Sequence, residues 1–279
     1  MGQTIRSFAL IPYLPWVLAF SAVLICSYLP ILMSEQVIDD WVAEDQILES
    51  LSSLYLFVTA GAFAAALFRS KTRFNIKDPV WLRRMFFLGF ALLFFVAGGE
   101  EISWGQRIFR IEIPEALEER NIQKELNLHN LDIFQGEDAI IPITTGRLGA
   151  LFALTFGALI PLACTLVKPV GQWLALRFPV LPASFSLLFL GNYALQKLLV
   201  RLLPAIPQLY HHPTMPVSEG VYEIREHGYA FALMVSVIFY VFFELKNPPR
   251  IRSPYKIPVE GINLSVDQEN SHENQRARS

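Results

Sequence analysis

The sequence predicts an all-α, polytopic membrane protein with about six transmembrane helices and an external loop that carries an interfacial helix. Two observations predict this fold class. Hydrophobic residues make up 53% of the 279 residues and charged residues only 17%, whereas soluble domains carry about 25% charged residues. Six apolar runs are each close to the roughly 20 residues that cross a bilayer. The net charge of −2 gives no basis for nucleic-acid binding, so the lipid bilayer is the expected partner.

The six apolar runs give the expected spans in order: 9–32, 47–68, 84–103, 147–167, 183–203 and 228–245. The first run is too long for a secretory signal and is followed by no small-residue cleavage site. The fifth run is interrupted by Lys197 and Arg201, which share one helix face. We expect that face to meet other helices, water or lipid headgroups rather than acyl chains.

The loops predict the orientation and the domain organisation. The loop between the second and third spans and the start of the C-terminal tail are rich in Lys and Arg, whereas residues 34–40 contain neither. The positive-inside rule therefore places both termini in the cytoplasm and the loop 104–146 outside, as in a multi-pass protein of the bacterial inner membrane. Residues 1–257 form the expected transmembrane domain, and the polar stretch 258–279 is an expected disordered cytoplasmic tail.

The external loop contains the expected interfacial helix. Pro114 is followed by an acidic stretch typical of a first helical turn. Apolar residues continue from there to Leu126, so we expect a helix that lies on the membrane surface.

Two adjacent carboxylates, Glu100 and Glu101, end the third run. Placing two such charges at a bilayer boundary costs free energy unless they form ion pairs, bind a cation or are solvated. If the helix continues, Glu100, Trp104 and Arg107 lie on one helix face. Arg107 could then neutralise Glu100 and leave Glu101 available for catalysis or ligand binding. The two residues before the pair are glycines, which permit close helix approach or a local distortion. The carboxylates are therefore either a structural closure of the helix end or catalytic and ligand-binding groups.

Histidines and further carboxylates fall on the same external side. His129 lies between Asn127 and Asn130 in the external loop, and Glu223 and His227 form an i,i+4 pair at the start of the last span. Such groups bind metals or transfer protons. The structural alternatives are a loop histidine bonded to backbone and an acidic first turn favoured by the helix dipole. The adjacent pair His211 and His212 need not reach one metal, because neighbouring side chains often diverge.

The string GEEISWGQRIF at 99–109, with NLHN at 127–130, resembles a motif of a family of bacterial multi-pass membrane proteins. The resemblance implies no activity. The Glu-Glu pair also starts the motif of CAAX-processing-type intramembrane proteases, but Gly105 stands where that motif has arginine, and the Phe-x-x-x-His and His-x-x-x-Asn patterns are missing. The His-x-x-x-His pair of ceramidase-like hydrolases is missing too, since Phe231 is four residues after His227.

Three functions stay open, and the sequence does not decide whether the chain is an enzyme. The first is a hydrolase or transferase acting on a lipid-linked or peptide substrate at the outer face. Glu101 and His129 would be its catalytic centre, with Glu100 and Arg107 supporting them. A divalent metal such as zinc is the expected cofactor, with the ligands Glu101, His129, Glu223 and His227.

The second function is a cation- or proton-coupled transporter, in which Lys197 and Arg201 would face the glutamates across a cavity. The third is a non-catalytic assembly or sensing subunit. If the glutamates and histidines lie close together in the fold, a catalytic or metal-binding function is favoured. If they lie far apart, a structural role is favoured.

Overall fold

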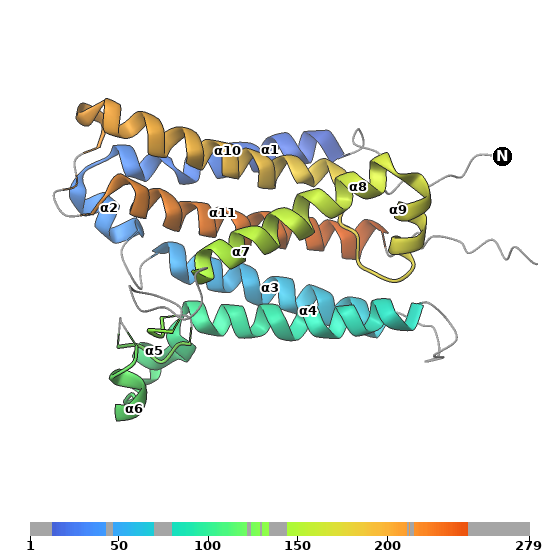
Figure 1. Cartoon of the computed structure of the whole chain (residues 1–279), viewed down its shortest axis with the longest axis horizontal. Coiled ribbons are helices and arrows are strands. Elements are labelled where there is room, and N and C mark those ends of the chain that lie inside the picture. The colour runs from blue at the N-terminus through green and yellow to red at the C-terminus, as the bar shows by residue number, and fades with distance from the viewer. Residues whose placement is uncertain are drawn as a thin grey trace, which may run out of the picture. The chain divides into compact units, whose positions relative to one another are not determined.

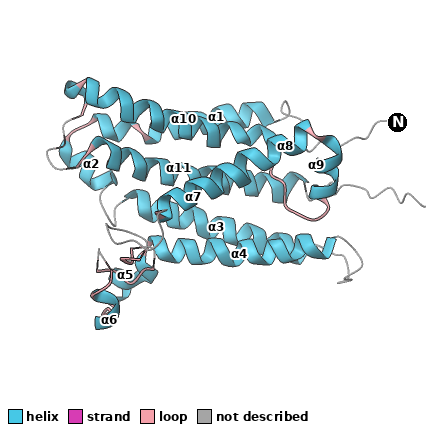
Figure 2. Cartoon of the chain, viewed as in Figure 1, coloured by secondary structure: helices cyan, strands magenta, loops and turns pink. Residues whose placement is uncertain are grey.

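The computed structural model describes residues 13–42, 47–69, 80–121, 124–128, 130–133, 144–210, 212 and 215–244. All regular elements in these residues are helical, which confirms the all-α fold class (Figure 2). Five helical segments are long and apolar enough to cross a membrane: Leu14–Leu32, Glu35–Arg69, Trp81–Glu101, Gly146–Leu166 and Ala183–Ala205. The chain is therefore a polytopic membrane protein. The predicted tail, 258–279, lies outside the described residues.

Each of the six predicted spans corresponds to a helix. These helices are α1 (Leu14–Ser27), α3 (Ile47–Arg69), α4 (Val80–Glu101), α7 (Thr145–Leu154), α10 (Ser186–Leu202) and α11 (Val217–Phe239). A π-helical turn, Thr155–Leu159, joins α7 to α8 (Ile160–Leu166) and precedes Pro161, which has no backbone N–H to donate. A second π-helical turn, Tyr240–Glu244, extends α11.

Helix α11 is the central helix of the bundle. It contacts α1, α3, α7 and α10 and also the short helix α2 (Glu35–Val42), and Figure 1 shows it between α1 and α10 on one side and α3 and α4 on the other. Most of its residues are buried. It begins at Val217 and not near residue 228 as predicted, because its first turns carry charged side chains that lower the local hydropathy but meet protein rather than lipid.

The outer helices present apolar side chains outward. On α4, Leu92, Leu93, Phe95 and Val96 are all exposed, and on a membrane-spanning helix such a face contacts lipid. The opposite face of α4 packs on α3, where Phe63 stacks on Phe94 with ring centroids 5.9 Å apart. The bundle therefore has a phenylalanine-rich core and a lipid-facing surface.

Between α4 and α7 the chain leaves the bundle, and we call residues 102–133 the arm. It contains only short helices, α5 (Gln106–Phe109) and α6 (Glu115–Glu118). The interfacial helix expected after Pro114 is thus a single turn. It ends early because the chain turns at Asn121 and again at Lys124, whose φ is 55°, and folds back onto the end of α4. A further short helix, α9 (Lys168–Ala175), follows α8.

Candidate carboxylate site

Four carboxylates from three helices meet at one end of the bundle, which we call the acidic end. Glu49 lies in the first turn of α3, Glu101 is the last residue of α4, and Glu223 and Glu226 lie in the first turns of α11. The Glu101 carboxylate interacts electrostatically with those of Glu226, Glu49 and Glu223, and also with that of Glu100. All four side chains are partly buried. We call Glu49, Glu101, Glu223 and Glu226 the carboxylate cluster.

The cluster concentrates negative charge where water is partly excluded. Glu223 lies in the polar first turns of α11, and this part of the helix is not among the five segments apolar enough to cross a membrane. Burial, together with the carboxylates of Glu226 and Glu49, raises the pKa of Glu223. A group of like charges in this setting must retain protons or bind a cation to stay compact.

Arg225 supplies positive charge beside the cluster. Its Nη2 lies 2.7 Å from Glu226 Oε1, and its guanidinium lies over the Tyr222 ring at 5.0 Å. The Glu226 carboxylate also abuts Gly146 in the first turn of α7, where a larger residue would displace it. The positive end of that helix favours the negative charge. Glu226 is therefore held by protein groups.

Glu101 and Glu223 are the less compensated members. Among the described residues neither makes an ion pair or a hydrogen bond, although Arg225 lowers the electrostatic cost at Glu223. These two carboxylates are the ones best able to take up a cation.

His227 lies one turn deeper on α11, and its hydrogen bonds define its tautomer. The Ser52 hydroxyl donates to the Leu48 carbonyl at 2.8 Å, so it can only accept from His227 Nδ1, 3.4 Å away. A neutral ring with its proton on Nδ1 carries a lone pair on Nε2. Nε2 is therefore the atom that His227 would offer to a metal. Of the predicted site residues, the structure brings Glu101 and Glu223 into electrostatic contact, and His227 follows Glu223 by one turn on α11.

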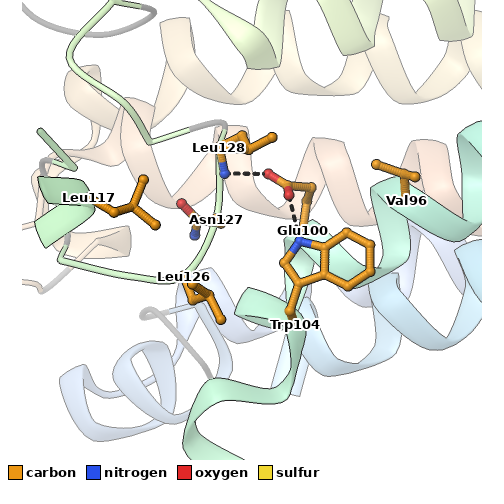
Figure 3. A pocket seen from close by; sticks show the side chains of 7 residues that line it. All are labelled: Val96, Glu100, Trp104, Leu117, Leu126, Asn127 and Leu128. Carbon is orange, nitrogen blue, oxygen red and sulfur yellow. Dashed lines mark hydrogen bonds between the residues drawn. The ribbon is translucent and has the colours of Figure 1, made fainter. Parts of the chain in front are cut away.

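Glu100 faces the arm and has a structural role. One carboxylate oxygen accepts from the Trp104 indole N–H at 2.7 Å, and the other accepts from the Leu128 backbone N–H at 2.6 Å (Figure 3). The premise of a continuing helix was wrong. Helix α4 ends at Glu101, and Ser103 and Trp104 adopt left-handed φ values of 46° and 53°, so positions 100, 104 and 107 do not form one helical stripe. The side chain of Arg107 lies outside the described residues, and its pairing with Glu100 stays a prediction.

The two glycines at the end of α4 both serve close packing, as predicted. A Cβ on Gly98 would lie 3.2 Å from the Ser53 carbonyl on α3, and a Cβ on Gly99 would lie 2.8 Å from the Trp104 ring. The Ser53 hydroxyl donates to the Gly98 carbonyl at 2.7 Å. One glycine therefore lets α3 approach, and the other makes room for the indole.

A buried polar network holds the arm together. The Glu125 carboxylate accepts from the Ser103 hydroxyl at 2.8 Å and from the Asn127 amide at 2.7 Å. The Asn121 amide donates to the Asn127 side-chain oxygen at 3.0 Å. Asn127 thus joins the two parts of the sequence motif and does not point toward solvent. His129 and His211 lie outside the described residues, so the predicted catalytic and metal-binding role of His129 stays a prediction.

A second group of metal-ligating side chains lies beside α2. Ligand atoms of Glu35, Asp39 and His212 all lie within 4.8 Å of one another. However, His212 Nδ1 accepts from the Met215 backbone N–H at 2.7 Å, which puts the ring proton on Nε2, 2.8 Å from Asp39 Oδ1. A metal at Nε2 would need that proton to move to Nδ1, where it would face the Met215 N–H. This group is therefore a hydrogen-bonded anchor that ties the loop before α11 to α2. The i,i+4 spacing of Glu35 and Asp39 was visible in the sequence, but nothing there indicated His212 as their neighbour.

The two basic residues that interrupt the fifth predicted span lie on the surface of α10. Lys197 and Arg201 are exposed on α10, and Lys197 Nζ lies 5.4 Å from the centroid of the Tyr193 ring on the same helix. A path between these residues and the glutamates of α4, as expected of the transporter, stays a prediction.

Comparison of the chain with protein-family models, with curated proteins and with solved structures finds no match. No relative therefore supplies an activity. The resemblance of the motif at 99–109 to a bacterial membrane family, and the orientation in the membrane, stay predictions.

Proposed function

We propose that the protein is an integral membrane hydrolase or transferase that binds a divalent cation at its carboxylate cluster. Its substrate would be lipid-linked or a peptide, and would be met at the outer membrane interface. The observation that supports this proposal is the electrostatic contact of Glu101 with Glu223 across two helices, one turn from His227 on α11.

The donor set fits a divalent cation. Carboxylate oxygens suit Mg²⁺ and Mn²⁺, and one imidazole makes Zn²⁺ competitive. When bound, such an ion would acidify a coordinated water and polarise a substrate carbonyl or phosphoryl oxygen. Glu101 and Glu223 would hold it, and Arg225 would keep Glu226 in place. His227 would offer the Nε2 lone pair to the ion, because its Nδ1 faces Ser52.

Cation binding by the purified protein tests the first half of the proposal. We expect Zn²⁺ or Mn²⁺ to bind with a measurable heat, and Glu101→Gln or Glu223→Gln to weaken that binding by at least about tenfold. Glu118→Gln is the matched control, because it makes the same charge change at an exposed position of the arm. Equal binding by all four proteins would overturn the cation site.

Turnover tests the second half. A panel of lipid esters, lipid phosphoesters and peptides should include a substrate whose cleavage requires the added ion and is lost in His227→Gln. If the ion binds and no member of the panel reacts, the non-catalytic sensing function replaces the enzyme.

A further inference from the structure

A groove of about 310 Å³ lies between the end of α4 and the arm. Figure 3 shows Val96, Glu100 and Trp104 on one side, and Leu126 and Leu128 with their neighbours on the other. Its volume is at the lower end of the range for pockets that bind small molecules. The groove is distinct from the carboxylate cluster, because Glu100 faces it and Glu101 does not line it.

The polar residues of the groove present no unused polar group to it. Both oxygens of Glu100 accept hydrogen bonds, from Trp104 and Leu128. The Asn127 amide donates to Glu125, and its oxygen accepts from the Asn121 amide. Because these groups are satisfied within the protein, the groove gains nothing from a polar occupant and favours an apolar one.

The groove is continuous with the lipid-facing surface of α4. Leu92 is 58% exposed, Leu93 46% and Val96 44%, and Val96 belongs both to this surface and to the groove. At the far end Leu128 is 56% exposed. Trp104, which is 40% exposed, is of the residue type enriched at membrane interfaces. A hydrocarbon chain leaving the bilayer along α4 would therefore pass from Val96 to Leu128 over a wall that is apolar except at Glu100 and Asn127. The Glu100 carboxylate is occupied by its hydrogen bonds from Trp104 and Leu128.

We propose that this groove binds one acyl chain of a membrane lipid, which enters beside Val96 and lies against Trp104. The chain would bury the apolar walls that the arm and α4 leave open. Its binding requires neither a cation nor turnover. A failure of this proposal is thus distinguishable from a failure of the proposed function.

Lipid retention by the purified full-length protein tests the groove. After exchange into detergent doped with phosphatidylcholine, native mass spectrometry should find one retained lipid on the wild type. Leu126→Trp should fill the groove and reduce retention by about tenfold or more. Leu93→Trp is the control, since it makes the same substitution on the lipid-facing surface outside the groove. Equal retention by the three proteins would overturn the proposal.

A fluorescence measurement that does not use Leu126→Trp keeps the proposal testable if that variant does not fold. The contribution of Trp104 is the difference between the wild type and Trp104→Phe. Phosphatidylcholine with brominated acyl chains should quench that contribution and saturate near one lipid per protein. Quenching by aqueous iodide but not by the brominated lipid would show that water fills the groove, and the proposal would be wrong.

Discussion

Replacing Gly99 with alanine should destabilise the protein through Trp104. The added Cβ would lie 2.8, 2.9 and 3.0 Å from three atoms of the indole, all closer than ordinary carbon contacts. Moving the ring away would disturb the hydrogen bond that its N–H donates to Glu100 at 2.7 Å and its contact with Phe95, with ring centroids 6.3 Å apart. Overpacking of this kind costs about 1–3 kcal/mol. Alanine regains up to about 1 kcal/mol of helix propensity, so we expect a net loss of about 0–2 kcal/mol.

Unfolding of the purified protein in mixed micelles, titrated with a denaturing detergent, measures this loss. Gly89→Ala is the control on the same helix, because a Cβ there meets nothing within 4 Å; it should be neutral or stabilising by up to about 1 kcal/mol. Adding Trp104→Leu to Gly99→Ala should relieve the clash, so the two changes should couple by more than about 0.5 kcal/mol. Equal stabilities of the two alanine variants, or strict additivity in the double variant, would refute the packing of Trp104 over Gly99.

Two further predictions concern buried carboxylates. Glu125→Ala should lower the free energy of unfolding by about 1–3 kcal/mol, because Ser103 and Asn127 lose their acceptor. The control Glu118→Ala, at an exposed position, should change it by no more than about 0.5 kcal/mol. The same detergent titration measures both variants, and equal losses would contradict the network. For Glu223 the raised pKa means that the folded state holds a proton that the unfolded state releases near its ordinary pKa of about 4.3. In the absence of divalent ions the free energy of unfolding should therefore fall as the pH rises from about 5 to 8, and Glu223→Gln should flatten that dependence; a stability that rises over this interval in the wild type and not in the variant would contradict it.

The membrane helices could be predicted because lipid-facing helices need apolar side chains almost all round. The start of α11 could not. A central helix is shielded from lipid by its neighbours, so Glu223 and Arg225 cost less there than hydropathy implies. Apolar runs locate helices that meet lipid better than they locate a helix that meets mainly protein.

The carboxylate cluster could be predicted in part. Placing Glu101 and Glu223 at one end of the bundle needed only the alternation of the spans. Glu226 lies three residues after Glu223 on the same helix, and its charge is balanced by the adjacent Arg225. The distance from Glu49 to the other three carboxylates depends on how α3 packs against α11. The periodicity of a single segment does not predict the packing between two helices.

The fold of the arm could not be predicted from local preferences. Ser103 and Trp104 adopt left-handed φ values, which non-glycine residues rarely do. Such conformations persist where the surroundings stabilise them, and here the surroundings are the bonds from Ser103 to Glu125 and from Trp104 to Glu100. Those partners are up to 22 residues away, so the turn and the network that stabilises it form together.

The consecutive glutamates at the end of α4 connect these two parts of the molecule. Adjacent residues on a helix point about 100° apart, so Glu100 can face the arm while Glu101 faces α3 and α11. The hydrogen bonds from Trp104 and Leu128 to Glu100 fix the last turn of α4, and that turn carries the backbone of Glu101. The arm therefore positions a member of the carboxylate cluster without contributing a ligand from its described residues. This arrangement gives a physical reason why the segments 99–109 and 127–130 occur together. Leu128 in the second segment bonds to Glu100 and so fixes the helix end that carries Glu101.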